Sequence, residues 1–288
     1  MKNAAIFLCF FVMSCSGRKE QSAQMIPLDL DEVSGIEYIE DTGLTWILQD
    51  SGNENKIYAL DGTGRISISV QVDKVENTDW EALASDSEGN IYIGDFGNND
   101  NDRRDLSIYK INKDQLAQGR AGVGAKTLFN YPEQKDFPPK KSGRIYDAEA
   151  FFEHNGSFYL FTKNRSSGFD GSLNVYKIPN KPGTFAAQLI GSLTTCGKYN
   201  KCAITGADIS ADGKNVVLLS GNAVWLIRDF DEDNISNAHM EELDLGSVSQ
   251  KEGIAFKDAN TVLITDEKEK KSGGYLYEVK LSDLKRKP

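Results

Sequence analysis

Histidine is the scarcest chemically versatile residue in this chain, with only two copies, His154 and His239. A Ser-His-acid catalytic triad is therefore not expected, because His154 lies in a tight-turn sequence and His239 is far from any glycine-flanked serine. The four cysteines do not form two pairs of zinc-ligand spacing, so a structural zinc site is not expected either. These shortages argue against two common kinds of catalytic and metal chemistry.

Positive charge is also in deficit, because 33 Lys and Arg stand against 43 Asp and Glu and the formal net charge is −10. No basic stripe dominates the chain, so nucleic acid is not expected as a partner. After residue 13 no apolar run approaches the roughly 20 residues that a membrane-spanning helix needs. The bulk of the chain is therefore expected to be one water-soluble domain with a large core.

The first 15 residues have the pattern of a bacterial lipoprotein signal peptide. Lys2 supplies a positive charge, residues 4–13 form a short apolar run, and Val12-Met13-Ser14-Cys15 resembles a lipobox. Cleavage before Cys15 would free this cysteine for lipidation, and several acyl chains give stable membrane anchoring. An ordinary secretory signal cut nearby is the alternative. Residue 16 is Ser and not Asp, which by resemblance to sorted bacterial lipoproteins indicates an outer-membrane lipoprotein. Such a protein belongs to the bacterial cell envelope and is either periplasmic or surface-exposed.

The remaining chain divides into a tether and a domain. Residues 16–27 are predicted to be a polar tether, because 16–24 are too hydrophilic to fold, and residues 28–288 are predicted to be a single domain. On this reading the membrane is contacted through the lipid anchor only.

Cys196 and Cys202 are the cysteines that remain once Cys9 is removed with the signal and Cys15 carries lipid. They lie close together in a loop rich in Gly, Asn and Lys, which in an oxidising compartment predicts a disulfide. A ring this short is expected to shape its loop more than it stabilises the whole fold.

One local pattern occurs five times: an acidic or small polar residue opens an apolar strand, a tight turn follows, and a second strand ends in a polar residue. The copies span residues 34–50, 81–95, 149–164, 205–220 and 252–266. Their starts are spaced by about 47 to 68 residues, close to the length of one four-stranded blade with its loops. The chain is therefore predicted to be an all-β, five-bladed β-propeller. A six-bladed ring is the alternative, with a degenerate sixth blade hidden in the longest interval.

The C-terminal sequence supplies a third strand to the last blade at residues 275–279 but barely a fourth. Since an open ring would expose strand edges, residues 24–30 are predicted to pair there and close the ring by joining the two ends of the chain.

Long loops are predicted to gather on one face of the propeller. Turns between first and second strands are tight, whereas the connections from second to third strands are long and polar, as at 96–105 and 164–172. Because neighbouring strands run antiparallel, these long loops share a face with the starts of the innermost strands. Rigid scaffolds present binding residues on such loops, although loops also vary wherever insertions are tolerated.

Acidic residues recur at this looped face. Glu81, Glu149 and Glu252 open innermost strands, and Asp50, Asp95 and Asp266 close their neighbours. Carboxylates around one mouth repel each other unless a cation or protons intervene, and several oxygen ligands suit Ca²⁺. The candidate metal ligands are Glu81, Glu149, Glu252, Asp95 and Asp266. The alternative is that each acid is a structural latch to the adjacent blade; Ser34 and Thr205 at the equivalent positions make the ring uneven, which favours a site.

Four further residues are candidates for ligand binding at the same face: Asp50, Asn98, Lys163 and Arg165. Cations near a carboxylate-bound metal would attract an anionic small molecule such as a phosphoester or an acidic sugar. Lysines and arginines that only keep exposed loops soluble are the plainer explanation. A protein partner at the looped face is also open.

The segments DWEALASDSEGNIYIGDFGNN (79–99), YDAEAFF (146–152), TGADIS (205–210) and KEGIAF (251–256) resemble the bacterial family named SdiA-regulated. This resemblance implies a five-bladed propeller with a central calcium ion. A looser likeness extends to phytase-like esterase propellers and calcium-dependent lactonase propellers. It implies Glu81, Glu149 and Glu252 as ligands, with Asp95 and Asp266 as weaker candidates.

Two functional classes follow. The favoured one is a membrane-anchored extracytoplasmic propeller with a Ca²⁺ site at the looped face, which binds a ligand or a protein. The alternative is a calcium-dependent hydrolase of phosphoesters or lactones, in which the ion polarises the substrate and activates water.

Overall fold

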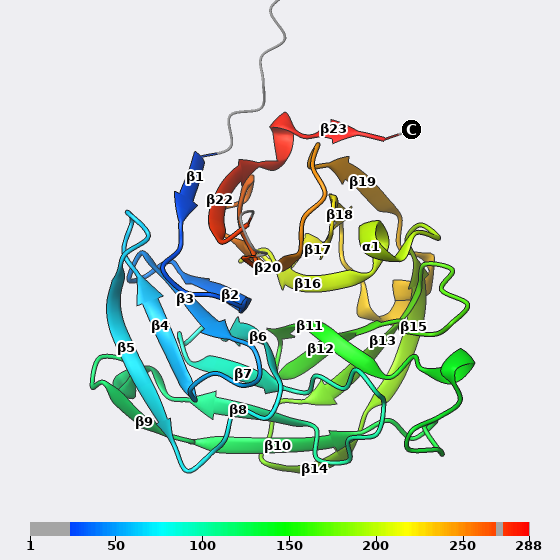
Figure 1. Ribbon diagram of the computed structural model, residues 1–288, viewed down its shortest axis with the longest axis horizontal. Coiled ribbons are helices and arrows are strands. Elements are labelled where there is room, and N and C mark those ends of the chain that lie inside the picture. Colours follow the sequence, from blue (N-terminus) through cyan, green and yellow to red (C-terminus); the bar gives the residue numbers. More distant parts are fainter. Residues whose placement is uncertain (1–23, 269–272, 288) are drawn as a thin grey trace, which may run out of the picture.

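The computed structural model describes residues 24–268 and 273–287 and arranges their strands as five sheets around a central axis (Figure 1). The prediction of an all-β, five-bladed propeller is confirmed, and no sixth blade occurs among the described residues. In each sheet the strands follow one another outward from the axis in chain order. Four of the five sheets also have an outermost strand that comes from a distant part of the chain.

Blade one contains β2 (Val33–Ile39), β3 (Leu44–Gln49), β4 (Lys56–Leu60), β5 (Ile66–Asp73) and outermost β9 (Arg120–Gly122). Blade two contains β6 (Trp80–Ser85), β7 (Ile91–Asp95), β8 (Ser107–Ile111), β10 (Ala125–Asn130) and outermost β14 (Gly183–Ala186). Blade three contains β11 (Asp147–His154), β12 (Ser157–Lys163), β13 (Ser172–Pro179) and β15 (Gln188–Thr194).

Blade four contains β16 (Ile204–Ile209), β17 (Val216–Ser220), β18 (Ala223–Ile227), β19 (Met240–Asp244) and outermost β23 (Lys285–Arg286). Blade five contains β20 (Lys251–Phe256), β21 (Thr261–Asp266), β22 (Tyr275–Lys280) and outermost β1 (Gln24–Pro27). The helices are short: α1 (Tyr199–Cys202) and the 3-10 helices η1 (Lys113–Gln115), η2 (Lys141–Gly143), η3 (Glu232–Asn237) and η4 (Leu281–Asp283). No helix in the described part of the chain is long and apolar enough to cross a membrane.

The two ends of the chain close the ring. β1 pairs antiparallel with β22, with Gln24 opposite Glu278 and Pro27 opposite Tyr275, so the predicted closure is confirmed. This pairing corrects the domain boundary, because residues 24–27 were assigned to the tether and instead belong to blade five. The predicted signal peptide, Cys15 and the rest of the tether lie outside the described residues.

Three more outer strands tie neighbouring blades together. β9 lies in the chain between strands of blade two but pairs in parallel with β5 of blade one. In the same way, β14 lies between strands of blade three but pairs in parallel with β10 of blade two. β23 returns from blade five to pair with β19 of blade four. These exchanges cover strand edges that would otherwise be exposed.

The innermost strands share one irregularity. The register with the second strand shifts by one residue near the start of all five, at Ser34, Glu81, Glu149, Thr205 and Glu252. An extra residue of this kind is a β-bulge, which bends the strand and redirects a side chain. The five residues predicted to be equivalent are therefore equivalent in the structure, and each stands at the channel end of its blade.

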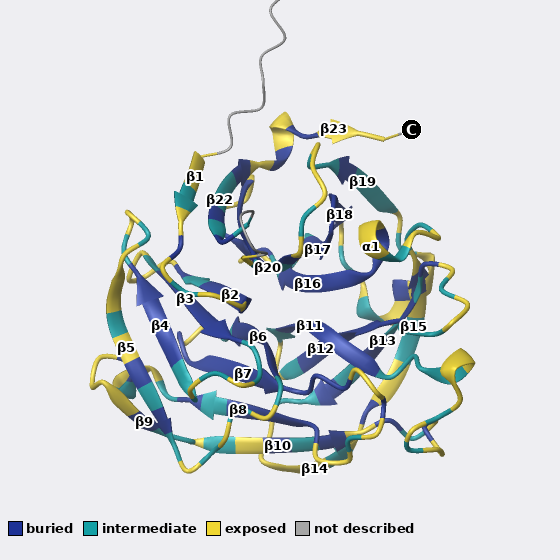
Figure 2. Cartoon of the chain, in the orientation of Figure 1, coloured by how far each residue is buried: buried dark blue, intermediate teal, exposed yellow. Residues whose placement is uncertain are grey.

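The core lies between the blades. Figure 2 shows burial concentrated on the inner and middle strands, with exposed residues on outer ones such as β1 and β10. Trp46 and Trp80 pack in the cluster between blades one and two, and Phe161 and Trp225 in the cluster between blades three and four. Both faces of an inner strand are buried against neighbouring blades, so nearly every residue of these strands is buried.

At the far end of the channel, two buried acids are held by hydrogen bonds. Ser85 Oγ donates to Glu37 Oε1 at 3.0 Å, and Asp208 accepts from the backbone N–H groups of Ile209 at 2.7 Å and Phe256 at 2.6 Å. Burial raises the pKa of Asp208 to about 7, and burial together with Asp208 raises the pKa of Glu37.

Deleting residues 24–30 should lower the melting temperature by about 10 °C, because the β1–β22 hydrogen bonds and the burial of Ile26 and Leu28 are lost. Deletion of residues 16–23 is the control and should leave the melting temperature unchanged. Differential scanning calorimetry compares the two. Equal melting temperatures for the 24–30 deletion and the intact protein would contradict the closure.

The buried acids predict a pH dependence. Because the pKa values of Glu37 and Asp208 are raised on folding, their ionisation opposes folding, and stability should fall as the pH rises from about 4 to about 7. Glu37→Gln keeps the oxygen that accepts from Ser85 and should add about 1–2 kcal/mol above pH 7 while changing little near pH 4. Urea unfolding across this range measures it, with the exposed Glu40→Gln as control. The same change at both pH extremes would show that Glu37 ionisation carries no such cost.

Candidate metal centre

The three glutamates at the bulges converge at one end of the channel. A hydrogen bond joins the side chains of Glu149 and Glu252, and the charge of Glu149 acts on Glu81. Glu81 and Glu149 are buried and Glu252 is partly buried. The expected convergence of acidic side chains from separate blades is therefore present.

Glu149 is neutralised by two cations of its own blade. Lys163 Nζ forms an ion pair with Glu149 Oε2, and Arg165 Nη2 lies 2.6 Å from Glu149 Oε1. Arg165 Nε also pairs with Asp147. Burial opposes both positive charges, but these acids raise the pKa values of Lys163 and Arg165 above their usual range.

These ion pairs revise the role expected for Lys163 and Arg165. Both were predicted to bind an anionic ligand, whereas here their charges balance buried carboxylates. Removing one member of such a buried pair leaves a charge uncompensated, which is strongly unfavourable. The two cations therefore hold the mouth together and are not free to bind an anion.

Glu252 shares a hydrogen bond with Glu149, and a hydrogen bond between two carboxyl groups needs one proton. Burial raises its pKa well above the usual value, and the nearby charge of Glu149 raises it further despite Lys163. Protonated Glu252 can donate the hydrogen bond to Glu149. Neither Glu149 nor Glu252 needs an added cation.

Glu81 differs from both. It is 6% exposed, and among the described residues no hydrogen bond or ion pair reaches its carboxylate. Its oxygen lies within 4.8 Å of carboxylate oxygens of Asp50 and Asp79. We call these three residues the acidic group. Burial and the surrounding acids raise the pKa of Glu81 well above its usual value, and burial together with Asp50 raises that of Asp79 to about 6.

The local chain explains how the acidic group is assembled. Asp79 precedes Glu81 by two residues, just before the bulge of β6, and Asp50 follows the end of β3. Asn77 Nδ2 donates to the Asp50 carbonyl oxygen at 2.9 Å, and Asn77 Oδ1 accepts from the Trp80 N–H at 3.0 Å. This side chain therefore holds the two segments side by side.

Gly97 leaves the space that the acidic group needs. A Cβ at this position would lie 2.3 Å from Glu81 Oε1 and 2.4 Å from Asp79 Oδ2, closer than atoms can approach. A side chain at this position would therefore displace both carboxylates from their present places.

Asp95 and Asp266, which the sequence predicts as metal ligands, lie outside the acidic group. Asp95 accepts from Arg103 Nη2 at 2.9 Å and from the Tyr109 hydroxyl at 3.3 Å. Asp266 accepts from the Tyr277 hydroxyl at 2.7 Å. Both residues are 1% exposed and join the second strand to the third strand of their own blade, whereas the structural alternative was a latch to the adjacent blade.

The strand register explains why Asp50 behaves differently. Asp95 lies opposite Trp80 and Asp266 opposite Lys251, but in blade one the equivalent residue is Gln49, opposite Val33. Asp50 is therefore one position further along the chain. It joins the acidic group, whereas Asp95 and Asp266 turn into their blades.

Asn98 and the two bulge hydroxyls have structural partners. The Asn98 N–H donates to Asp147 Oδ1 at 2.7 Å, and Asn98 Oδ1 accepts from the Arg103 N–H at 2.9 Å, so its amide oxygen is already engaged. Ser34 Oγ donates to the Trp80 carbonyl oxygen at 2.9 Å, and Thr205 Oγ1 donates to the Lys251 carbonyl oxygen. In blades one and four the bulge residue latches onto the next blade.

Sequence reasoning missed Asp79, Asp147 and Glu267. A readable pattern existed for two of them, because Asp stands two residues before both Glu81 and Glu149. Glu267 lies at the mouth, where burial and the charge of Asp50 raise its pKa to about 7.

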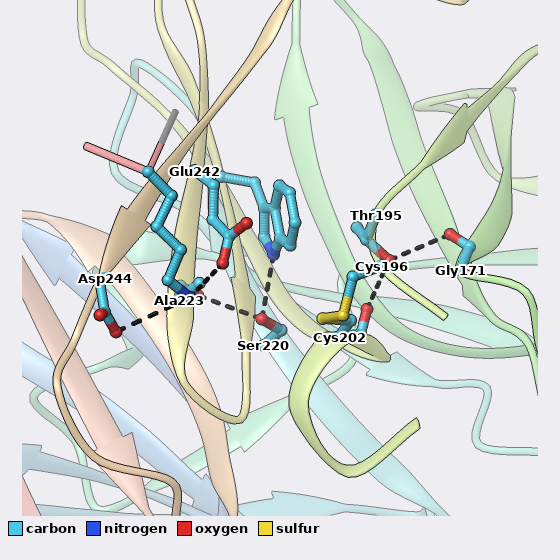
Figure 3. The surroundings of a disulfide bond; sticks show 10 residues. Gly171, Thr195, Cys196, Cys202, Ser220, Ala223, Glu242 and Asp244 are labelled. Atoms are coloured by element: carbon cyan, nitrogen blue, oxygen red, sulfur yellow. Dashed lines mark hydrogen bonds and ion pairs between the residues drawn. A yellow bond between two sulfur atoms is a disulfide. The ribbon is translucent and has the colours of Figure 1, made fainter. Parts of the chain in front are cut away.

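The predicted disulfide between Cys196 and Cys202 is present, with a Cα–Cα distance of 5.4 Å. Figure 3 shows the Thr195 hydroxyl between the carbonyl oxygens of Gly171 and Cys202, at 3.0 and 2.7 Å. The ring contains the start of α1, and Arg165 Nη1 donates to the Tyr199 hydroxyl at 3.0 Å. The disulfide therefore holds Tyr199 at the rim of the channel mouth.

The sequence matches no protein-family model and no curated protein. Among solved structures, the PQQ-bound aldose sugar dehydrogenase from Streptomyces coelicolor aligns over 91% of this chain and 99% of that chain, with 10% identity and a TM-score of 0.51. A gluconolactonase from Xanthomonas campestris aligns over 90% of this chain and 79% of that chain, with 12% identity and a TM-score of 0.46. The first likeness supports the propeller fold, and neither bears on activity.

Replacing both Cys196 and Cys202 by alanine should cost about 2 kcal/mol of unfolding free energy, the loop-closure entropy of a ring this short. Urea unfolding with and without a reducing agent measures the loss. Reductant should destabilise the wild type by the same amount and leave the variant unaffected. A wild type that is insensitive to reductant, together with an unchanged variant, would show that the bond does not contribute.

Proposed function

We propose that this protein is a membrane-anchored extracytoplasmic propeller that binds one Ca²⁺ at Asp50, Asp79 and Glu81 and holds a ligand at its looped face. The observation that carries the proposal is the unequal neutralisation of three equivalent glutamates. Glu149 pairs with Lys163 and Arg165, and Glu252 shares a hydrogen bond with Glu149. The carboxyl group of Glu81 has no such partner among the described residues and is buried beside two further carboxylates. Burial and these acids raise its pKa as well, so a cation bound there would displace a proton.

The donor set favours Ca²⁺ among the common ions. All three groups are carboxylates, which are hard oxygen ligands, and Zn²⁺ would prefer sulfur or imidazole nitrogen. Ca²⁺ takes six to eight oxygens in flexible geometry, so positions remain for water and for a ligand. Asp50 and Asp79 are only partly buried, which leaves the acidic group open toward the mouth.

The anchoring part of the proposal rests on the lipobox-like sequence that ends at Cys15. The disulfide Cys196–Cys202 supports an oxidising compartment outside the cytoplasm, such as the bacterial envelope. Membership of the SdiA-regulated family is part of the same proposal and is supported by the motifs around Glu81, Glu149 and Glu252. We expect no nucleic-acid partner for a chain of net charge −10.

Hydrolysis of phosphoesters or lactones is the second candidate function. Glu267 favours it, because a carboxylate at the mouth with a pKa of about 7 suits a general base. Gln250 Nε2 donates to Glu267 Oε2 at 3.0 Å and orients it. A bound Ca²⁺ would supply polarisation of the scissile group.

The proposal predicts that Ca²⁺ at about 100 times its Kd raises the melting temperature by about 5–10 °C, and that Glu81→Gln abolishes the rise. Glu252→Gln is the matched control, because it makes the same change at the equivalent bulge of blade five. It should keep the calcium response. Differential scanning fluorimetry with Ca²⁺ and with a chelator measures both. A wild type that does not respond, or a loss of equal size in the two variants, would overturn the assignment.

Screens for phosphoesterase and lactonase turnover separate the two functions. Turnover that disappears on chelation and in Glu267→Gln, while Ca²⁺ still binds that variant, would establish the hydrolase. Calcium binding without turnover on any substrate of the screen would favour the binding module.

A further inference from the structure

A hollow of about 550 Å³ opens on the looped face beside blade three, and it is not part of the acidic group. Its walls come from the loops after β7 and β12, from the loop before β11, and from the disulfide loop. The residues that matter here are Asn99, Arg144, Arg165, Ser166, Phe169 and Tyr199. The volume lies in the range of small-molecule sites.

The hollow borders the proposed calcium site through one ion pair. Arg165 lines the hollow and pairs with Asp147, and the charge of Asp147 acts on both Glu81 and Asp79. A ligand in the hollow would therefore be linked to the proposed ion through Arg165 and Asp147.

The two arginines of the hollow differ in how firmly they are paired. Arg165 is committed to Asp147, Glu149 and the Tyr199 hydroxyl. Arg144 Nη1 lies 2.8 Å from Asp100 Oδ1, but the Asp100 side chain is 72% exposed, so this pair contributes little.

Arg144 also has hydrogen-bonding capacity to spare. Its Nε is buried and has no acceptor. No carboxylate lines the hollow, so the exposed Asp100 is the acid with which an oxyanion there would compete for Arg144. A guanidinium that turns from Asp100 toward such a group can bind it through two parallel hydrogen bonds.

The rest of the lining suits a hydroxylated ring. Phe169 and Tyr199 meet edge to face with their centroids 5.2 Å apart and form an aromatic wall, and the disulfide and Arg165 hold Tyr199 in place. The Asn99 amide and the Ser166 hydroxyl add neutral groups that can exchange hydrogen bonds with ligand hydroxyls.

We propose that this hollow binds a hydroxylated ring compound that carries one oxyanion group, such as a sugar acid, with the ring against Phe169 and Tyr199 and the oxyanion on Arg144. This assignment rests on the proposed function, because it names the ligand class that the looped face holds beside the ion. It replaces Lys163 and Arg165 by Arg144 as the residue that recognises the anion.

Isothermal titration calorimetry of the full chain with Ca²⁺ tests the assignment, using glucuronate as the probe and glucose as its neutral match. Glucuronate should bind with a Kd below about 1 mM and glucose at least about tenfold more weakly. Arg144→Gln should weaken glucuronate binding about tenfold or more. Arg120→Gln is the control, because Arg120 is an exposed arginine paired with Asp73 on blade one and should leave binding unchanged.

The outcomes separate this inference from the calcium proposal. Equal affinity of the wild type and Arg144→Gln, equal affinity for glucose and glucuronate, or no glucuronate binding to the calcium-loaded wild type would each overturn the inference. Calcium binding, measured in the same samples, would survive all three results. If calcium does not bind but glucuronate still binds in a way that depends on Arg144, the calcium proposal is wrong and the assignment of the hollow stands.

Discussion

The rest of this molecule depends on the neutralisation of buried carboxylates at the axis of the propeller. The bulge in every innermost strand turns one residue toward the channel, so whatever occupies that position is taken out of water. A hydroxyl meets this constraint by bonding to the next blade, as Ser34 and Thr205 do. A carboxylate needs a cation or a proton, because a buried unpaired charge is very unfavourable. Glu149 has Lys163, and Glu252 shares a hydrogen bond with Glu149, whereas Glu81 has no such partner among the described residues.

The difference between blades begins in the second strands. The residue paired directly before the bulge is Asp95 in blade two and Thr162 in blade three. Lys163 lies one position further along the chain, as Asp50 does in blade one. Lys163 delivers a positive charge to Glu149, whereas Asp95 takes Arg103 for itself. The position of Lys163 therefore carries a cation in blade three and an acid, Asp50, in blade one. The proposed ion site lies off the axis, toward blades one and two.

The fold could be predicted because its determinants are local. Turn residues, apolar runs and the missing fourth strand of the last blade are visible along the chain, and they correctly indicated five blades and the pairing of β1 with β22. The convergence of Glu81, Glu149 and Glu252 followed from the repeat. The hydrogen-bond and ion-pair partners of these acids could not be predicted from the repeat, because strand register decides which side chains meet. A difference of one residue separates Asp50 from the latch position of Gln49, and no repeat pattern shows which acid Lys163 or Arg165 will meet.

A crystal grown with Ca²⁺ and examined by anomalous scattering tests the central claim most directly. The proposal predicts one anomalous peak with Asp50, Asp79 and Glu81 as its protein ligands. It predicts none between Glu149 and Glu252, where Lys163 and Arg165 pair with Glu149 and a hydrogen bond joins the two acids. A peak on the axis between Glu149 and Glu252, with Lys163 displaced, would contradict this account.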